Sequence, residues 1–352
     1  MVKTKKTFLF YILLIILFTP IISCQMKKEL PEFHVEMSHP ENKYRIEPVY
    51  DRIKTLEGVR ASFPYGGSSG GWGSSRKSWT EQHGTPIGAD ITYYAGYEDA
   101  FYHLNVEFPI DTIKDWTKRF YPNSEVEENQ DELEEYIYDR KPSQRRVYDE
   151  FSDLVFGFAP KGMVVVWLRF SGNQKELGRY QAELVDDDQA LEAKLFASWS
   201  MRRKEVREIS LIPDASPEKW DNYRIKYFWK PIITSENKNF RLFWVLTEYF
   251  NAEYENKLRP MVLHPKNEKR AIPSLITFFW ETGKGEKFEG RVFFDWQRTN
   301  EQFKNEDTRD NEIQIKIEAD NRDFQVMLNG KTLETVNKRV FRTDREFKES
   351  YK

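Results

Sequence analysis

The residues of this chain best suited to acid–base chemistry lie around His103. Hydrophobic and polar side chains alternate through this stretch, and Glu98 and Asp99 come shortly before the histidine. An imidazole beside a carboxylate can act as a general base with its orienting group, which would suit an envelope hydrolase. The same alternation is typical of a half-exposed strand histidine that makes ordinary hydrogen bonds, so both interpretations stay open.

Other patterns add little chemistry. Gly66–Gly70 fits G-x-S-x-G, but a nucleophile elbow needs a helix directly after the serine, and Gly71-Trp72-Gly73 does not begin one. The five histidines show no zinc-ligand spacing, and the glycines form no phosphate-binding loop. The sequence therefore predicts no metal, no cofactor and no set of catalytic residues.

Cys24, the single cysteine, closes an N-terminal segment with the features of a secretory leader. Three lysines stand among the first six residues, and the run Phe8–Ile22 is almost wholly apolar. This run of about 15 residues is shorter than the roughly 20 that a helix needs to cross a bilayer. Ser23 directly before Cys24 resembles the lipobox of bacterial lipoproteins, although an ordinary secretory leader or a short membrane anchor remains an alternative.

The lipobox interpretation predicts how the protein is held. We expect residues 1–23 to be a cleaved signal peptide, Cys24 to be lipidated, and residues 24–31 to be a short tether. Each acyl methylene buried in a bilayer contributes about 0.8 kcal/mol, so two or three chains would hold the protein at the membrane. By analogy with enteric lipoprotein sorting, Gln25 after the cysteine favours the outer membrane. No thiol would remain for a disulfide or a zinc–thiolate site.

Charge argues against one class of partner. The chain has 54 basic and 57 acidic residues, a formal charge of −3, and loss of the leader lysines makes it −6. Nucleic-acid binding favours a net basic field, so it is disfavoured. The acidic segment 124–135 is expected to be solvated and matches no EF-hand spacing.

The hydrophobic pattern predicts a mainly β or α+β fold. Aromatic residues make up 15% of the chain and fall in alternating runs, which suit half-buried strands. We expect two tandem antiparallel β-sandwich-like domains with a few short helices, at 32–212 and 218–338, and a polar tail at 339–352. The predicted elements include helices at 112–120 and 189–203, a central strand at 163–168, and a hairpin turning at Asn329-Gly330.

A short internal match raises the hypothesis of a duplication. Asn222-Tyr223-Arg224-Ile225 echoes Lys43-Tyr44-Arg45-Ile46. A match this short also arises by chance, so the sequence leaves the question open.

Three motifs together resemble the DUF2931 family of bacterial lipoproteins. They are Gly71-Trp72-Gly73, the segment from Thr85 to Tyr102, and the segment from Val155 to Leu168. The resemblance covers roughly Tyr44 to Leu184 and departs from the family at Lys161, where members more often carry glycine. It implies kinship and an envelope location, and it carries no catalytic residues to this chain.

We therefore expect a lipid-anchored envelope protein that binds another macromolecule or a glycan and is not an enzyme. One version is an immunity-type protein that neutralises a toxin through its acidic segment. A glycan-binding version would use Trp72 with Tyr93 or Tyr94, and predicts that these rings are exposed side by side. Trp72 in a Gly/Ser loop could equally be a plug of the β-sandwich.

Overall fold

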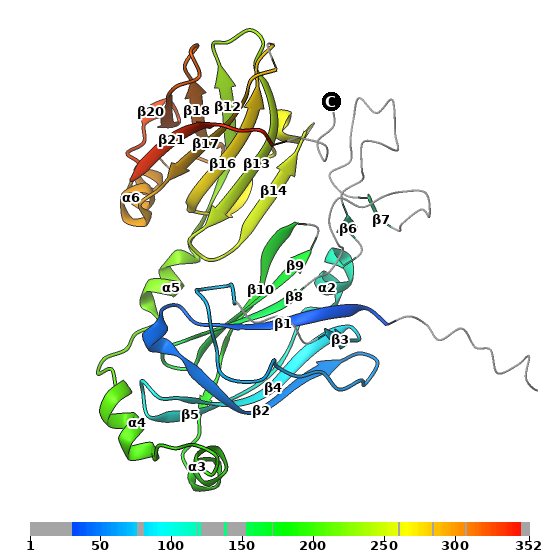
Figure 1. Ribbon diagram of the computed structural model, residues 1–352, viewed down its shortest axis with the longest axis vertical. Coiled ribbons are helices and arrows are strands. Elements are labelled where there is room, and N and C mark those ends of the chain that lie inside the picture. Colours follow the sequence, from blue (N-terminus) through cyan, green and yellow to red (C-terminus); the bar gives the residue numbers. More distant parts are fainter. Residues whose placement is uncertain are drawn as a thin grey trace, which may run out of the picture. The chain divides into compact units, whose positions relative to one another are not determined.

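The computed structural model describes residues 30–75, 81–117, 119–120, 137–138, 153–170, 172–259, 261–283, 285–306 and 308–345 (Figure 1). Cys24, the expected leader and the acidic segment 124–135 lie outside these residues. The compact unit described below begins at Glu32.

Two layers of strands enclose the first hydrophobic core. Tyr93 in one layer contacts Phe158 in the other, with ring centroids 4.8 Å apart. One layer contains β1 (Glu32–Ser38), β3 (Glu81–His83), β8 (Asp153–Ala159), β9 (Met163–Phe170) and β10 (Asn173–Gln181). The other contains β2 (Ile46–Thr55), β4 (Pro86–Ala95), β5 (Ala100–Glu107) and β11 (Glu183–Leu184).

A second pair of layers encloses a separate core. Phe278 and Phe324 meet across it with ring centroids 5.2 Å apart. One layer contains β12 (Lys226–Ser235), β15 (Glu268–Ala271), β18 (Asn311–Ile317), β19 (Phe324–Leu328) and β20 (Lys331–Thr332). The other contains β13 (Arg241–Tyr249), β14 (Tyr254–Leu258), β16 (Pro273–Glu281), β17 (Lys287–Phe293) and β21 (Asn337–Arg342).

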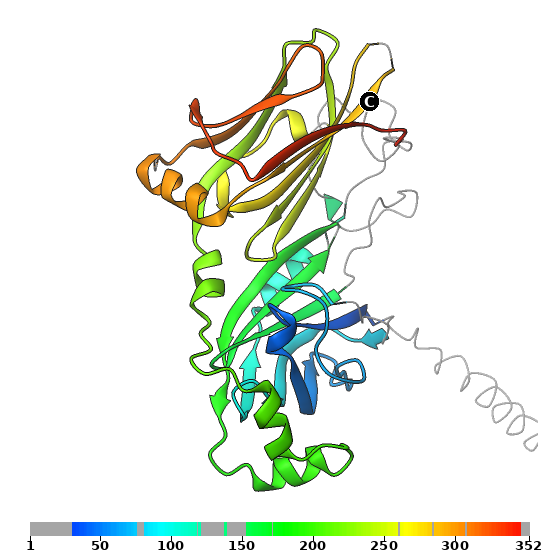
Figure 2. The same ribbon diagram turned by 60° about the vertical axis from the view of Figure 1, so that its left-hand side comes forward.

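Pairing of β10 with β14 at Gln174 and Tyr254 joins one layer of each half into a ten-stranded sheet. Shorter elements complete the described fold (Figures 1 and 2). These are the strand pair β6 (Arg119–Phe120) and β7 (Ile137–Tyr138), the 3-10 turns η1 (Asn42–Tyr44) and η3 (Met261–Leu263), and the helices α2 (Ile110–Trp116), α3 (Gln189–Phe196), α4 (Arg203–Ser210), α5 (Glu218–Tyr223) and α6 (Trp296–Glu306). Within the described ranges, no helix has the length and apolar character needed to span a bilayer.

The mainly β prediction is confirmed, and so is the hairpin at Asn329-Gly330. Both turn residues have positive φ, 52° and 81°, as a type I′ turn requires. The antiparallel expectation is incomplete, because β1 pairs with β8 and β12 with β18 in parallel. β21 also extends to Arg342, into the segment expected to be a polar tail, because it pairs with β17. The proposed domain boundaries stay a prediction.

The predicted helices differ in extent. The single helix expected at 189–203 is two helices, because Arg202 has an extended backbone and acts as the N-cap of α4. Its amide donates a hydrogen bond to Glu205 Oε2 at 2.7 Å, which starts a new helix. α2 ends at Trp116 and is shorter than the predicted 112–120.

The two halves repeat one order of elements. Each half begins with a strand, β1 or β12, that pairs in parallel with a strand that follows the helix in the chain, β8 or β18. In each half the second strand pairs with the strand of a hairpin, β4–β5 or β16–β17, and this hairpin leads directly into α2 or α6. The first strand also pairs antiparallel with a short strand, β3 or β15, that runs into the hairpin.

The register is repeated as well. β2 is irregular against β4 at Pro48/Tyr50 and Lys54/Thr55, and β13 is irregular against β16 at Leu242/Trp244 and Glu248/Tyr249. Each irregularity of β13 lies the same number of residues beyond its counterpart in β2. Because a β-bulge occupies a defined position in a strand pairing, this agreement indicates that the two registers are equivalent. Two backbone bonds also recur: Leu56 N to Thr85 O at 2.9 Å matches Phe250 N to Ile272 O at 3.1 Å, and Phe108 N to Ile87 O at 2.8 Å matches Phe294 N to Ser274 O at 3.0 Å.

The halves are therefore two copies of one fold. The sequence match that suggested a duplication is out of register, because Tyr44 precedes β2 whereas Tyr223 precedes β12, the counterpart of β1.

Candidate functional site

His103 does not pair with the residues that the sequence suggested. Its Nε2 lies 2.8 Å from Asp90 Oδ1 on the neighbouring strand β4, and both side chains are 43% exposed. Because both side chains are this exposed, their contact competes with water and contributes little to stability. His103 lines none of the three pockets described below.

Glu98 and Asp99 instead hold neighbouring segments in place. Glu98 accepts hydrogen bonds from the Tyr102 hydroxyl at 3.1 Å and from the Lys161 amide at 3.0 Å. Asp99 accepts bonds from the Tyr94 hydroxyl at 2.9 Å and from Arg203 Nε at 2.7 Å. The pairing of His103 with Glu98 or Asp99 that the sequence suggested is therefore not formed.

Trp72 packs against the first core. Its ring lies 5.0 Å from that of Trp167 in an edge-on contact and 6.3 Å from that of Trp220. The following residue, Gly73, donates its amide to Ser38 Oγ at 3.1 Å, which fixes the loop. The structure favours the plug over the exposed ligand contact.

Tyr93 is fully buried, and Tyr94 is only 1% exposed. Tyr93 faces the space between the two layers, whereas Tyr94 lies under α3 and α4. The expected platform of exposed rings at Trp72, Tyr93 and Tyr94 is therefore not formed, because both faces of β4 are covered.

The structure also pairs Ser68 with His39, which sequence reasoning missed. Ser68 Oγ lies 3.0 Å from His39 Nδ1 and accepts a bond from the Ile46 amide at 3.0 Å. Both side chains are buried, and burial lowers the pKa of His39. The pair therefore anchors the glycine-rich loop and is closed to a substrate.

One exposed group of described residues brings possible metal ligands together. Glu32, Glu81 and His83, at the edge of the β1–β3 pair, place ligand atoms within 4.8 Å of one another. All three are exposed, and exposed acidic groups of this kind are common without an ion, so the group carries no proposal.

The most apolar of the three pockets lies below α4, and we call it the α4 pocket. Its volume is about 500 Å³, within the range of about 300–1,000 Å³ that small-molecule pockets occupy. Tyr94, near the end of β4, and Gly96 and Tyr97, in the turn that follows it, form part of the lining. The other lining residues include Trp199, Met201, Val206, Ile209, Leu211 and Ile212.

A network of charges positions α4 over this pocket. Arg203 bonds to Asp99 Oδ1 at 2.7 Å, to Asp188 Oδ2 at 2.8 Å and to Glu192 Oε2 at 3.0 Å. Burial opposes the charge of Arg203, but these carboxylates outweigh that effect and raise its pKa. The turn after β4, the start of α3 and the start of α4 are therefore tied together by one guanidinium group.

Exposed apolar side chains lie at this pocket. Ile209 is 73% exposed and Leu211 is 42% exposed. Large exposed apolar side chains that gather at a hollow are a feature of binding surfaces. The motif around Tyr93 and Tyr102, which supported the family resemblance, thus builds a pocket as well as a core.

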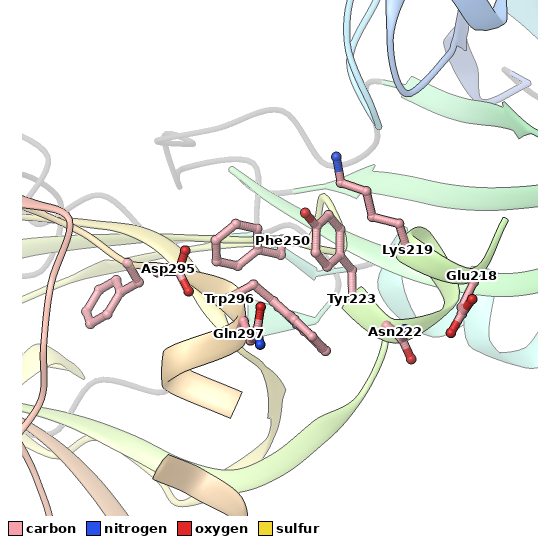
Figure 3. Close-up of a pocket in the computed structure, with 9 residues that line it drawn as sticks. Glu218, Lys219, Asn222, Tyr223, Phe250, Asp295, Trp296 and Gln297 are labelled. Atoms are coloured by element: carbon pink, nitrogen blue, oxygen red, sulfur yellow. The ribbon is translucent and has the colours of Figure 1, made fainter. Parts of the chain in front are cut away.

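Two other pockets are lined partly by residues of the second half. One of about 340 Å³ is lined by Trp72, Arg169, Gln174 and Tyr254, among others. The other, of about 490 Å³, lies between α5 and α6, and we call it the α5–α6 pocket (Figure 3).

Comparison with known proteins gives kinship and no activity. No curated protein matches the chain. A solved structure, the pilus adhesin SpaC from Lactobacillus rhamnosus GG in its open conformation, is 7% identical with a TM-score of 0.14. That match covers 86% of this chain and 40% of the adhesin, and it carries no argument about fold or function.

The family comparison is stronger. Residues 25–218 match the family described as "Protein of unknown function (DUF2931)", and this range is more than half of the chain. It includes every residue that lines the α4 pocket. The chain therefore belongs to the DUF2931 family.

Proposed function

We propose that this protein is a lipid-anchored component of the bacterial cell envelope that works by binding a protein partner at the α4 pocket. The anchor would be Cys24, at the end of the leader-like segment, with the outer membrane as the favoured location. No nucleic acid is expected as a partner, since the chain is net acidic.

The proposed binding site is supported by the presence of exposed apolar side chains at a pocket. Ile209 and Leu211 are exposed beside a pocket lined by Trp199 and Met201. Protein interfaces concentrate their binding energy in such pockets, which receive an apolar or aromatic anchor of the partner. Methionine adapts its shape to a partner, which favours recognition at this site.

The charge network makes this site preorganised. Arg203 holds α4 in place before any partner arrives, so binding would not have to order the helix. An immunity-type protein is a narrower version of this proposal. It would add the acidic segment 124–135, which lies outside the described residues, as a contact for a basic toxin.

Photo-crosslinking tests the site in cells. A photoreactive phenylalanine analogue at position 209 should give a discrete protein adduct, and Met201→Asp should abolish it. The same analogue at Leu184, which is 58% exposed but does not line the pocket, is the matched control. Equal adducts from positions 184 and 209, or an adduct that survives Met201→Asp, would contradict the proposal.

A further inference from the structure

The α5–α6 pocket combines aromatic faces with hydrogen-bonding groups (Figure 3). The ring of Tyr223 lies 5.1 Å from that of Phe250 and 5.6 Å from that of Trp296, with interplanar angles of 44° and 54°. The three half-buried rings are tilted against one another. Polar groups complete the lining: Glu218, Lys219, Asn222, Asp295 and Gln297.

The two copies of the fold differ at two of these aromatic positions, Phe250 and Trp296. Phe250 corresponds to Leu56, because their amides make equivalent backbone hydrogen bonds. Trp296 opens α6 as Ile110 opens α2, after equivalent strands. The first copy thus has aliphatic side chains where the second has Phe250 and Trp296, and these two rings both pack against the second core and line the pocket.

The pocket wall supplied by α5 is held rigidly. Arg179 bonds to both carboxylate oxygens of Asp221, at 3.2 and 3.1 Å, and Arg224 bonds to Glu176 at 2.7 Å. Trp220 is 4% exposed and fixes the buried side of the same helix. Tyr223 and Asn222 are therefore preorganised, which reduces the entropy that a ligand must overcome on binding.

The charges of the pocket, with two carboxylates and one paired lysine, argue against an anionic ligand. Lys219 is paired with Glu41 at 3.3 Å, so it offers little net charge to an anion. Amide groups donate and accept hydrogen bonds, and carboxylates accept them, which matches a ligand whose hydroxyls do both. Saccharides join such hydroxyls to an apolar ring face that can pack on aromatic side chains.

From these features we propose that the α5–α6 pocket is a saccharide-binding site. The pyranose face packs on Tyr223 and Trp296, and the hydroxyls bond to Asn222, Asp295 and Gln297. Apart from Glu218, the lining of this site lies beyond the family-matched residues, and the site shares no lining residue with the proposed partner site at the α4 pocket, so either can fail alone.

Calorimetric titration tests this inference on the full-length protein in a detergent without a sugar headgroup. The probes are maltotriose, cellotriose and triacetylchitotriose, with choline as a competitor for the aromatic faces. At least one trisaccharide should bind with a dissociation constant of about 1 mM or lower. Trp296→Ala and Tyr223→Ala should weaken binding about tenfold or more, as expected when an aromatic anchor is truncated.

Trp199→Ala, in the α4 pocket, is the matched control and should bind as the wild type does. The exposed Gln297→Ala and the polar Asn222→Ala should also weaken binding, and they decide the test if Trp296→Ala does not fold. Absence of saturable binding by all three trisaccharides at 10 mM, wild-type affinity in the folded pocket variants, or saturable binding of choline alone would each overturn the proposal.

Discussion

Glu255 is a buried carboxylate whose charge depends on two cations. Lys175 Nζ is in contact with one of its oxygens, and Arg270 Nε lies 2.9 Å from the other. Burial opposes ionisation of Glu255, but Lys175 and Arg270 outweigh burial and lower its pKa from 4.5 to about 2. The group lies on β14, next to the strand pairing that joins the two halves.

Stability should therefore fall in acid. Between pH 4.5 and pH 2 the unfolded chain binds a proton at Glu255 that the folded chain does not, so the free energy of unfolding decreases as the pH falls through this window. Glu255→Gln should be less stable at pH 7 by about 3 kcal/mol, because Lys175 and Arg270 lose their shared buried carboxylate, although Arg270 keeps its ion pair with Glu268. Urea unfolding at several pH values measures both effects.

The same titration has a clear contrary outcome. Glu255→Gln should show a weaker pH dependence between pH 4.5 and pH 2 than the wild type. Equal slopes for the two proteins would mean that Glu255 does not carry this stability.

For individual residues, the sequence indicates burial or exposure of a side chain better than it indicates which residues contact each other. His103 is half-exposed on a strand of alternating polar and apolar residues, as expected for a histidine that makes ordinary hydrogen bonds. Its partner Asp90, however, lies on the neighbouring strand. Spacing along the chain gives neighbours on one strand and does not give the register between strands. Both faces of β4 are covered by segments that are distant in the chain. The sequence around Tyr93 and Tyr94 therefore could not show that these rings are buried.

The central strand predicted at 163–168 is confirmed as part of β9, the second strand of the β8–β9 hairpin. Its turn has Lys161 and Gly162 at positive φ, 57° and 71°, and the strand Met163–Leu168 is fully buried as a central strand should be. An uninterrupted apolar run bounded by turn residues carries enough local information to define both strands and turn. The break between α3 and α4 was missed because it depends on the cap at Arg202.

Gly157 on β8 is where this hairpin meets Trp72. A Cβ at this position would lie 2.6 Å from the Trp167 ring and 2.7 Å from the Trp72 ring. Gly157→Ala should therefore lower the free energy of unfolding by about 1–3 kcal/mol, because the buried Trp167 ring and the half-buried Trp72 ring must move. Chemical denaturation followed by tryptophan fluorescence measures the change.

Gly71→Ala is the control, since a Cβ at Gly71 meets nothing within 4 Å. It should change stability by no more than about 0.5 kcal/mol. A Gly157→Ala protein as stable as the control would show that Trp72 and Trp167 are not tightly packed around this strand.

At the scale of the whole molecule, the two copies of the fold are joined by backbone pairing between β10 and β14. The short sequence match suggested a duplication, but it aligned segments that are not equivalent in the structure. The repeat is carried by strand order, bulges and backbone hydrogen bonds, which many side chains satisfy, so few identical residues remain to show it. The α4 pocket was out of reach for a similar reason, since its lining comes from segments as distant as Arg45 and Leu211.

We propose above all that an acyl chain on Cys24 attaches the folded β-rich part of the protein to the envelope membrane. Metabolic labelling with an alkyne-bearing fatty acid tests it most directly. The account predicts a labelled wild-type protein in the membrane fraction and an unlabelled Cys24→Ala protein released from it. An unlabelled wild-type protein, or equal labelling of Cys24→Ala, would contradict the claim.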